Sequence, residues 1–374
     1  MALVNPFKPT AGAEPPTLIG RDDILEDFRE GLESGVGAPA RLMRITGPRG
    51  SGKTVLLTEL GNIARNAGWA VVDETAHAGL VDSLKSAVQN RRSTKDISVS
   101  ASVALADASI TLSNDPAQLS LRSALNTATA KLTKKGKGLL ITLDEAQDAS
   151  AEDIREIAVA VQHLIREKRN IAFVFAGVTT GVMSLLDDDG VTFLRRAKAE
   201  ELAPIPTDEV ASALQATIEQ GGMTIEPDAL EHAASTTEGY AYLIQLVGFN
   251  IWRAATRRAG KTATVTLTDA KTGTDKAIRE FESTVLMSAV NGLPKTAMEY
   301  LLAMAEDELA SSTGELATRL GMPANALSGT RQLLISRQVI EPSARGYVMF
   351  SIPFLREFLV GNRATLLARY GIAE

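Results

Sequence analysis

Cysteine is absent from this chain of 374 residues, so neither disulfide bonds nor thiolate metal sites are available to it. The sequence also lacks an uninterrupted apolar run of about 18 residues, which is the length that a membrane-spanning helix needs. Its first residues do not have the basic and then apolar order of a secretory signal. We therefore expect a cytoplasmic protein with no membrane partner.

An excess of basic charge is missing as well. The formal net charge is −6 at pH 7. Neutralisation of phosphates by Lys and Arg supplies most non-specific affinity for nucleic acids, so the charge disfavours indiscriminate binding of this kind. Any contact with DNA has to come from a local patch. The 45% hydrophobic and 22% charged content is that of an ordinary globular protein, and the length predicts about two to three domains.

One stretch, Gly-Pro-Arg-Gly-Ser-Gly-Lys-Thr at residues 47–54, fits the phosphate-loop pattern G-x-x-x-x-G-K-[ST] at every required position. An apolar run precedes it and a helix-like run follows. The glycines let backbone N–H groups turn inward around phosphate oxygens, while Lys53 reaches the β- and γ-phosphates and Thr54 holds Mg²⁺. The predicted nucleotide-binding residues are Gly47, Pro48, Arg49, Gly50, Ser51, Gly52, Lys53, Thr54 and Val55. The motif predicts binding of a nucleoside triphosphate.

A second motif, a pair of acidic residues after an apolar run, supports this prediction. The apolar run at residues 139–143 is typical of a strand buried on both faces of a parallel sheet, and it ends in Asp144 and Glu145. Such sheets bind their ligands at the carboxyl ends of the strands. We expect Asp144 to be the partner of Mg²⁺, directly or through water, and Glu145 to be the base that orients and polarises the attacking water.

The remaining segments predict the organisation of the chain. Residues 1–17 are rich in proline and should form an extended arm, and residues 22–34 a helix. Apolar residues alternate over about residues 96–113, which predicts a β-hairpin inserted into the α/β core. From residue 207 the pattern is wholly helical. Helices at 294–305, 313–321 and 323–338, followed by a hairpin at 339–350, have the order of a winged helix-turn-helix.

Three assignments have two explanations each. Thr179 or Thr180 places a hydroxyl near the γ-phosphate, or caps the next turn. Arg195 and Arg196 reach the nucleotide of a neighbouring subunit, or are solvated on a surface helix. The block 283–374 holds eight basic and eight acidic residues and thus no net charge, while Arg331 and Arg337 lie on its predicted recognition helix. It contacts DNA, or it serves protein interaction and packing.

Together these motifs resemble the AAA+ ATPases of the origin-recognition type and the similar STAND signalling ATPases. The resemblance rests on Leu18-Ile19-Gly20-Arg21-Asp22, the phosphate loop, Leu143-Asp144-Glu145-Ala146-Gln147 and the helical and winged C-terminal parts. It implies an α/β P-loop fold with a parallel sheet in the order 5-1-4-3-2, an α-helical lid and a C-terminal winged-helix domain. The corresponding boundaries are an arm at 1–17, a core at 18–203, a lid at 204–286 and a winged helix at 287–374.

The resemblance also implies roles for individual residues. Leu18, Ile19 and Arg21 would pack on adenine, and Tyr240, after Gly239, would mark the lid helix that faces the nucleotide. Ala241 stands where family members carry the lid proline, and the end of the strand at 177–180 lacks the asparagine that senses the γ-phosphate. These departures predict slow hydrolysis. The trans-acting arginine corresponds to Arg195 or Arg196.

From residues and resemblance together, we expect a Mg²⁺-dependent ATPase that acts as a conformational or assembly switch on protein or DNA. ATP is favoured over GTP because no [NT]-K-x-D guanine signature is present. The expected partners are ATP or ADP and a protein, which includes self-assembly. The alternative is an ATP-regulated DNA-binding protein that uses its winged helix and hydrolyses little.

Overall fold

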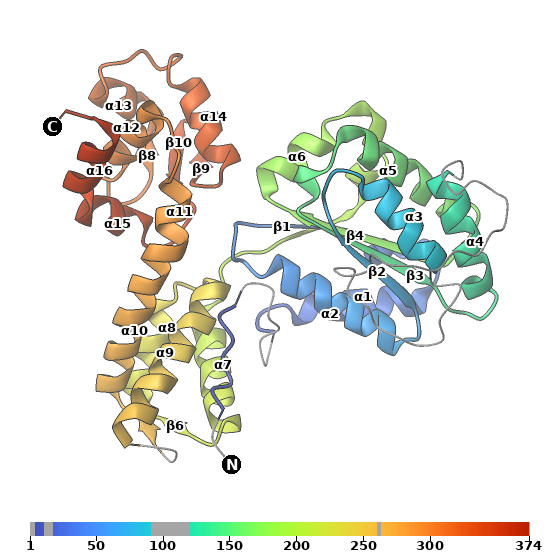
Figure 1. Cartoon of the computed structure of the whole chain (residues 1–374), viewed down its shortest axis with the longest axis horizontal. Coiled ribbons are helices and arrows are strands. Elements are labelled where there is room, and N and C mark those ends of the chain that lie inside the picture. The colour runs from blue at the N-terminus through green and yellow to red at the C-terminus, as the bar shows by residue number, and fades with distance from the viewer. Residues whose placement is uncertain (1–3, 11–17, 91–119, 260–262, 374) are drawn as a thin grey trace, which may run out of the picture. The chain divides into compact units, whose positions relative to one another are not determined.

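The computed structural model describes residues 4–10, 18–90, 120–259 and 263–373 (Figure 1). The chain divides into two units by its internal contacts. The sheet unit consists of Arg21–Gly47 and Gly52–Leu202. The helical unit consists of Met1–Gly20, Pro48–Ser51 and Ala203–Glu374, so that it includes the tip of the phosphate loop.

Five parallel strands form the centre of the sheet unit in the order β2-β3-β4-β1-β5. They are β1 (Leu42–Thr46), β2 (Ala70–Thr75), β3 (Leu139–Asp144), β4 (Ile171–Gly177) and β5 (Lys198–Glu201). Read from the other edge, this is the order 5-1-4-3-2, so the prediction is confirmed. Every residue of β3 and β4 is buried, as the continuous apolar runs predict for strands that are covered on both faces.

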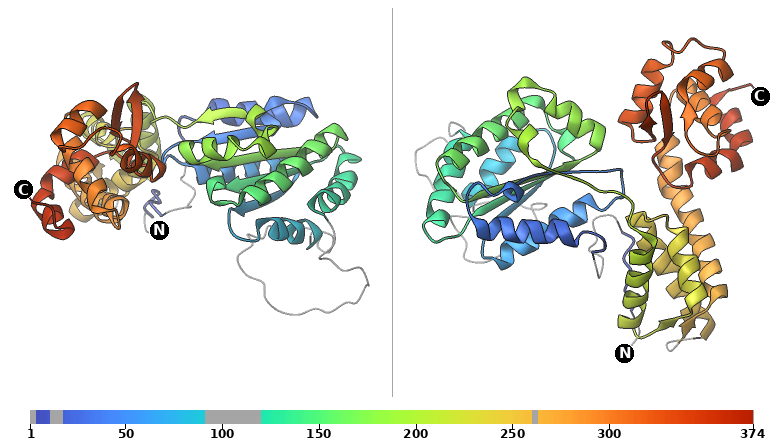
Figure 2. Two further views of the ribbon diagram at one scale, coloured as in Figure 1. Left: turned by 90° about the horizontal axis from the view of Figure 1, so that it is seen from above. Right: turned by 180° about the vertical axis from the view of Figure 1, so that it is seen from behind.

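Helices cover both faces of this sheet (Figures 1 and 2). One face carries α1 (Asp22–Ser34) and α2 (Lys53–Asn66), and the other carries α3 (Leu80–Asn90), α4 (Leu121–Thr133) and α5 (Ala151–Arg166). The helix α6 (Thr179–Leu186) follows β4 directly. Successive side chains of a strand point to opposite faces. Accordingly, Leu139, Ile141 and Leu143 share a core cluster with α3, α4 and α5.

The helical unit begins with a bundle of helices. These are α7 (Thr207–Gln220), α8 (Pro227–Thr236), α9 (Ala241–Ala259) and α10 (Leu267–Phe281), together with the short parallel strands β6 (Thr224–Ile225) and β7 (Thr264–Val265). Residues 4–10 pack against α9: Asn5 Nδ2 donates to the carbonyl oxygen of Phe249 at 3.0 Å, and Phe7 is buried where Gly248 has no side chain. The segment is therefore anchored by one aromatic side chain.

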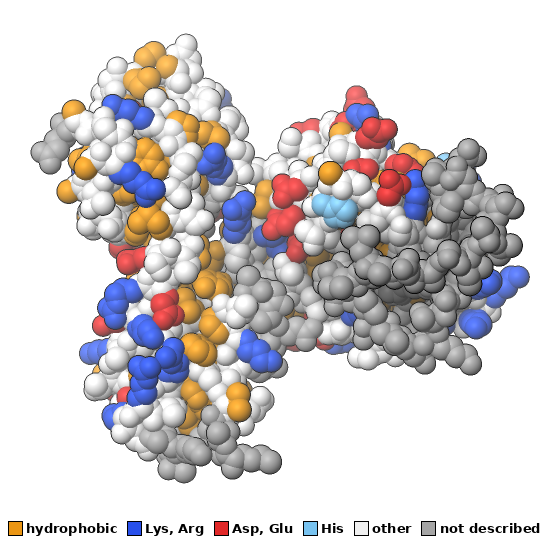
Figure 3. All heavy atoms as spheres, viewed as in Figure 1, with side chains coloured by type: hydrophobic (Ala, Val, Ile, Leu, Met, Phe, Trp, Pro, Cys, Tyr) orange, Lys and Arg blue, Asp and Glu red, His pale blue; other side chains and the backbone are white. Residues whose placement is uncertain are grey.

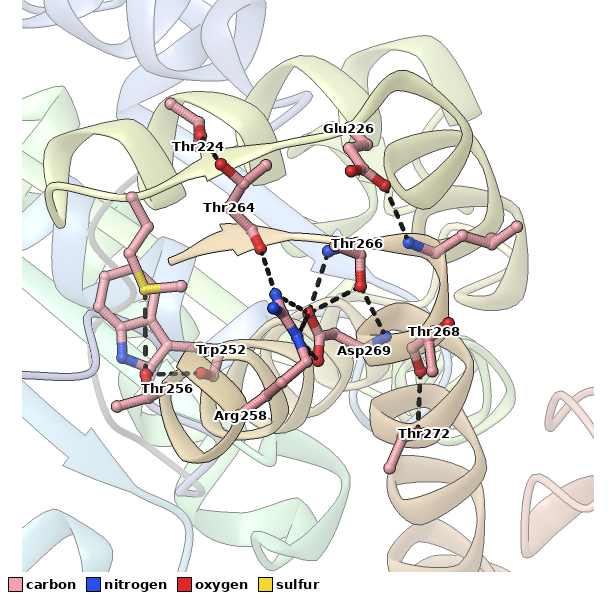
Figure 4. A network of polar contacts seen from close by, with 12 residues as sticks. Thr224, Glu226, Trp252, Thr256, Arg258, Thr264, Thr266, Thr268, Asp269 and Thr272 are labelled. Carbon is pink, nitrogen blue, oxygen red and sulfur yellow. Dashed lines mark hydrogen bonds and ion pairs between the residues drawn. The ribbon is translucent and has the colours of Figure 1, made fainter. Parts of the chain in front are cut away.

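A polar network joins the end of α9 to the start of α10 (Figure 4). The guanidinium of Arg258 forms a forked pair with the buried carboxylate of Asp269 at 2.7–3.0 Å. Asp269 also accepts from the N–H and the hydroxyl of Thr266, whose side chain accepts in turn from the N–H of Asp269. This is a reciprocal capping box at the start of α10. Because all acceptors are used, the carboxylate is tolerated in the core.

The last part of the helical unit is built on an extension of α10. A π-helical turn, Glu282–Leu286, leads into α11 (Met287–Val290). The following helices are α12 (Lys295–Met304), α13 (Thr313–Arg319), α14 (Ser328–Ser336), α15 (Leu355–Gly361) and α16 (Arg363–Tyr370). An antiparallel sheet in the order β8-β10-β9 consists of Ser311–Ser312, Tyr347–Phe350 and Ile340–Ala344. One continuous apolar cluster connects Phe7, the bundle and this part.

Several element predictions can be compared with the structure. The helix predicted at residues 22–34 is confirmed as α1. The helix predicted at 323–338 is shorter at both ends, since α14 spans only Ser328–Ser336 and residues 323–328 form tight turns closed by their own backbone hydrogen bonds. The predicted hairpin at 96–113 lies outside the described residues. Across the part of the chain that the structure describes, no helix has the length and apolar character to cross a membrane.

Candidate nucleotide-binding site

The phosphate loop connects β1 to α2. Its backbone reverses direction at Gly50 and Gly52, whose φ angles of 77° and 94° lie in the left-handed region that side chains disfavour. Gly52 is the N-cap of α2, and its carbonyl oxygen accepts the first helical hydrogen bond, from the N–H of Leu56, at 2.9 Å. The sequence thus forms a tight turn that ends at a helix N-terminus. Free N–H groups and the positive end of the helix dipole favour an anion there.

Three predicted site residues converge beside this turn. Lys53 is buried, and its ammonium donates to the carbonyl oxygen of Gly47 at 2.9 Å, so it lies beside the first residue of the loop. Thr54 Oγ1 donates to Asp144 Oδ2 at 2.6 Å. Residues that are far apart in the sequence are thereby joined at the carboxyl ends of the strands. The other oxygen of Asp144 accepts from the N–H of Glu145 at 2.9 Å.

Glu145 lies directly after β3, and its backbone is left-handed, with φ 49° and ψ 42°. Its Oε2 accepts a hydrogen bond from Gln147 Nε2 at 2.7 Å. Gln147 Oε1 accepts at its other end from the N–H of Val178, at 3.1 Å, just beyond β4. The sequence assigned no role to Gln147, because the glutamine and its partner on β4 meet only in the fold.

The tip of the loop, residues 48–51, contacts the start of α9 within the helical unit. The hydroxyl of Tyr240 donates to the carbonyl oxygen of Arg49, and the N–H of Tyr242 donates to that of Gly50 at 3.3 Å. A Cβ on Gly50 would lie 2.8 Å from Cζ of Tyr240, so glycine leaves room for the ring. Burial raises the pKa of Tyr240, which keeps the hydroxyl protonated as a donor. Ser51 Oγ is buried and has no hydrogen-bond partner among the described residues.

The two arginine candidates differ in their surroundings. Arg195 donates through Nε to the carbonyl oxygen of Leu186 at 2.6 Å and through Nη2 to that of Asp187 at 2.9 Å. It therefore satisfies carbonyl groups at the end of α6, which explains its presence without a nucleotide. Arg196 is exposed. A contact with the nucleotide of a neighbouring subunit stays a prediction for both.

The remaining candidates lie in different elements. Ile19 packs against the core of the helical unit, and Leu18 is half-buried. Arg21 is the N-cap of α1 in the sheet unit, and no side-chain capping bond is made there. Val55 lies in the first turn of α2 and is half-buried. Their contact with adenine, like the role of Thr179 and Thr180 at the start of α6, stays a prediction.

The side chains at the phosphate loop fit Mg²⁺ and a phosphate chain as ligands. The hydroxyl of Thr54 and the carboxylate of Asp144 are hard oxygen ligands of the kind that Mg²⁺ prefers, and they already lie within hydrogen-bond distance. The Lys53 ammonium, the helix N-terminus and the buried Ser51 hydroxyl, which makes no hydrogen bond within the described part of the chain, supply donors for an anion. Chemically, the arrangement can hold a metal-bound phosphate chain and place a carboxylate near its end.

Comparison with protein families gives two matches. Residues 17–174 match the AAA ATPase domain, and residues 283–359 match a domain of unknown function, DUF8462. No curated protein sequence matches the chain. The first match covers the segment that contains the phosphate loop, Asp144 and Glu145.

Two solved structures illustrate the fold that this chain shares. The ORC2 protein of Aeropyrum pernix, in ADPNP and ADP complexes, is 15% identical, with a TM-score of 0.65 over 97% of this chain and 98% of that one. The Walker-type ATPase of Pyrococcus abyssi is 16% identical, with a TM-score of 0.66 over 92% and 96%. At these identities the likeness concerns the fold. The chain therefore has an origin-recognition-like AAA+ fold, and its residues 17–174 match the AAA ATPase domain.

Proposed function

We propose that this protein binds ATP with Mg²⁺ at the phosphate loop and hydrolyses it, as a nucleotide-driven conformational or assembly switch. The observation that carries the proposal is the convergence of Lys53, Thr54 and Asp144. Lys53 Nζ lies 2.9 Å from the carbonyl oxygen of Gly47, and Thr54 Oγ1 lies 2.6 Å from Asp144 Oδ2. A buried ammonium and a hydroxyl–carboxylate pair beside a helix N-terminus supply complementary charge for a triphosphate and its metal.

In this proposal the roles are divided among four residues. Thr54 and Asp144 hold Mg²⁺, which when bound neutralises charge on the phosphate oxygens. Lys53 exchanges its bond to Gly47 for the β- and γ-phosphates. Glu145 accepts a proton from water as the water oxygen bonds to the γ-phosphorus. The bond from that phosphorus to the bridging oxygen breaks, and ADP leaves with the electron pair.

The first test asks whether Lys53 itself binds the nucleotide, as distinct from any effect of removing one lysine charge. Lys53→Ala removes the ammonium beside the loop and is expected to weaken Mg-ATP binding by at least about 100-fold, a loss of about 3 kcal/mol. Lys131→Ala, at an exposed position on α4, is the matched control and should bind normally. Isothermal titration with Mg-ATP measures both. Normal binding by a folded Lys53→Ala protein would contradict the phosphate-loop assignment.

The second test addresses hydrolysis and the metal. Glu145→Gln should bind Mg-ATP normally but lose turnover by about 100-fold or more, because the amide cannot accept the proton. Thr54→Val should weaken the binding of Mg-ATP while leaving the binding of ATP in EDTA unchanged. Phosphate-release and titration assays distinguish the two effects. Unchanged turnover in Glu145→Gln would remove Glu145 from this role.

Domain functions follow from the same proposal. We assign residues 18–203 to the ATPase core, 204–286 to a lid and 287–374 to a winged-helix domain, with residues 1–17 as an arm. Nucleotide state would change the lid contacts that begin at Tyr240. The contact of Tyr240 and Tyr242 with the loop tip supports this, because it links α9 to residues whose N–H groups would receive phosphate.

The target of the switch is protein, including self-assembly, or DNA. Lys and Arg side chains gather on the face of the helical unit that carries α8–α10 (Figure 3). The basic residues of α9 and α10 are Arg253, Arg257, Arg258, Lys271, Lys276 and Arg279. Arg258 is already paired with Asp269, and Lys276 lies 3.4 Å from Glu280. The other basic side chains would attract a polyanionic partner despite the negative net charge, and they support the alternative of an ATP-regulated DNA-binding protein with little hydrolysis.

Two measurements choose between these targets. Filter binding of duplex DNA at two salt concentrations, with and without ATP, should show retention that falls with salt if DNA is the target. No retention at low salt excludes DNA. Sedimentation with ATP and with ADP should show a size change if self-assembly is the response, and Arg196→Ala should abolish that change if this exposed arginine reaches a neighbouring nucleotide.

A further inference from the structure

We infer that Gln147 is a positioning residue for Glu145 and that it ties the orientation of the Glu145 carboxylate to the junction of β4 and α6. This inference rests on the proposed ATPase function, because it concerns the residue that would activate water. It adds a residue to which neither the motif nor the family match assigns a role. All of the contacts lie within the sheet unit.

The hydrogen bonds determine the orientation of the Gln147 carboxamide. The N–H of Val178 can only donate, so the oxygen of Gln147 has to face it, at 3.1 Å. The amino group then has to face Glu145 Oε2, at 2.7 Å. A flipped amide would place an amino group against an N–H and an oxygen against a carboxylate. Both ends of Gln147 are therefore specified, and the side chain bridges β3 and β4, which are neighbours in the sheet (Figure 1).

Two glycines make room for this bridge. A Cβ on Gly177 would collide with Gln147 Oε1, and a Cβ on Gly181 would lie 2.6 Å from the Cβ of Gln147. Neither glycine has a positive φ, so the backbone does not require glycine at either position. The space that they leave is filled by Gln147. Packing and hydrogen bonding thus restrict this side chain to one arrangement.

Glu145 needs such a restraint. It is only half-buried, and its left-handed backbone directs the side chain away from the course that a strand continuation would give it. Gln147 Nε2 is the one hydrogen-bond donor to its carboxylate that is seen among the described residues. A general base contributes fully only when its oxygen is held within about 1 Å of the productive position. Movement of β4 or α6 would reach Glu145 through this amide.

The test uses a length-matched substitution without polar atoms. Gln147→Met is expected to lower kcat by about 10- to 100-fold while the Kd for Mg-ATP changes by less than about twofold. Gln147→Glu keeps an acceptor for Val178 but presents a carboxylate to Glu145, so kcat should fall as far. Gln162→Met, at an exposed position on α5, is the control and should leave kcat unchanged.

A double-mutant cycle separates positioning from a merely structural effect. If Gln147 acts through Glu145, Gln147→Met should lower the single-turnover rate no further in a Glu145→Gln background. A full additional loss in that background, or wild-type kcat in Gln147→Met, would overturn the inference while leaving ATP hydrolysis intact. Failure of the proposed function looks different, since the wild-type protein would then show no Mg-ATP turnover, and the inference would fall with it.

Discussion

Arg41 provides a quantitative test of how the sheet unit is held together. This residue is only 4% exposed, and its hydrogen bonds go to two carbonyl oxygens and a carboxamide. Nε donates to the carbonyl oxygen of Gly31 at 2.7 Å and Nη2 to that of Leu32 at 2.6 Å, both near the end of α1. Nη1 donates to Asn170 Oδ1 at 3.1 Å, and the guanidinium lies 4.8 Å from the ring centre of Trp69. One side chain thereby joins α1 to the strand region.

The expected cost of replacing it follows from these contacts. Arg41→Met leaves two buried carbonyl groups unpaired, at about 1–3 kcal/mol each, and it also relieves the burial of a charge, which lowers the pKa of Arg41 in the folded protein. The net loss should be about 2–3 kcal/mol. Arg41→Lys should cost at least as much, because the charge stays buried while the planar fork that reaches both carbonyls is lost.

Urea unfolding followed by tryptophan fluorescence can measure this loss. The chain has two tryptophans, and Trp69 is the one in the sheet unit, so a Trp252→Phe background reports on that unit alone. The midpoint should fall by about 1 M urea for Arg41→Met. Arg29→Ala, which removes an exposed ion pair on α1, is the control and should leave the midpoint unchanged. A midpoint for Arg41→Lys equal to that of the wild type would refute the reasoning.

Two further predictions concern the helical unit. Burial by itself raises the pKa of Asp269, but bonds from Arg258 and Thr266 lower it below its ordinary value overall. The stabilisation by Asp269 is therefore complete above about pH 4 and is lost as the pH falls through the folded pKa. Asp269→Asn should remove this contribution to the acid dependence of the thermal unfolding midpoint. An unchanged acid dependence in the variant would contradict the role of Asp269. Phe7→Ala should lower the free energy of unfolding by about 3–5 kcal/mol, because the buried ring packs on Gly248. Trp252 fluorescence in a Trp69→Phe background measures this loss, and an unaltered midpoint would show that the segment adds no stability.

Local patterns were sufficient for a large part of the fold. The helix at 22–34 was predicted with its bounds, because its apolar residues repeat at helical spacing and glycines follow it. The buried strand β3 was predicted from the largely apolar run at residues 139–143. The order of the strands came from the resemblance of the motifs to a known family, because apolar patterns do not specify which strands are neighbours.

Other features are invisible to such patterns. The two-residue strands β6 and β7 are too short to show a period, and α14 begins later than its apolar spacing indicates because turns follow Pro323. Arg41 resembled any other basic residue in the sequence. Its burial depends on the carbonyl groups of α1 and on Trp69, which lie at separate positions in the chain.

By itself the sequence determined the phosphate loop and the two carboxylates after β3. The backbone freedom of glycine, the positive charge of lysine and the negative charge of an acidic pair belong to the residues themselves and can be recognised from their spacing. Only the tertiary structure decided that Thr54 meets Asp144 and that Gln147 connects Glu145 to Val178. It also decided that Arg195 is engaged by the end of α6. The physical reason is that hydrogen bonds depend on distances of about 3 Å between atoms, and such distances between remote residues arise only when the strands pair and the helices pack.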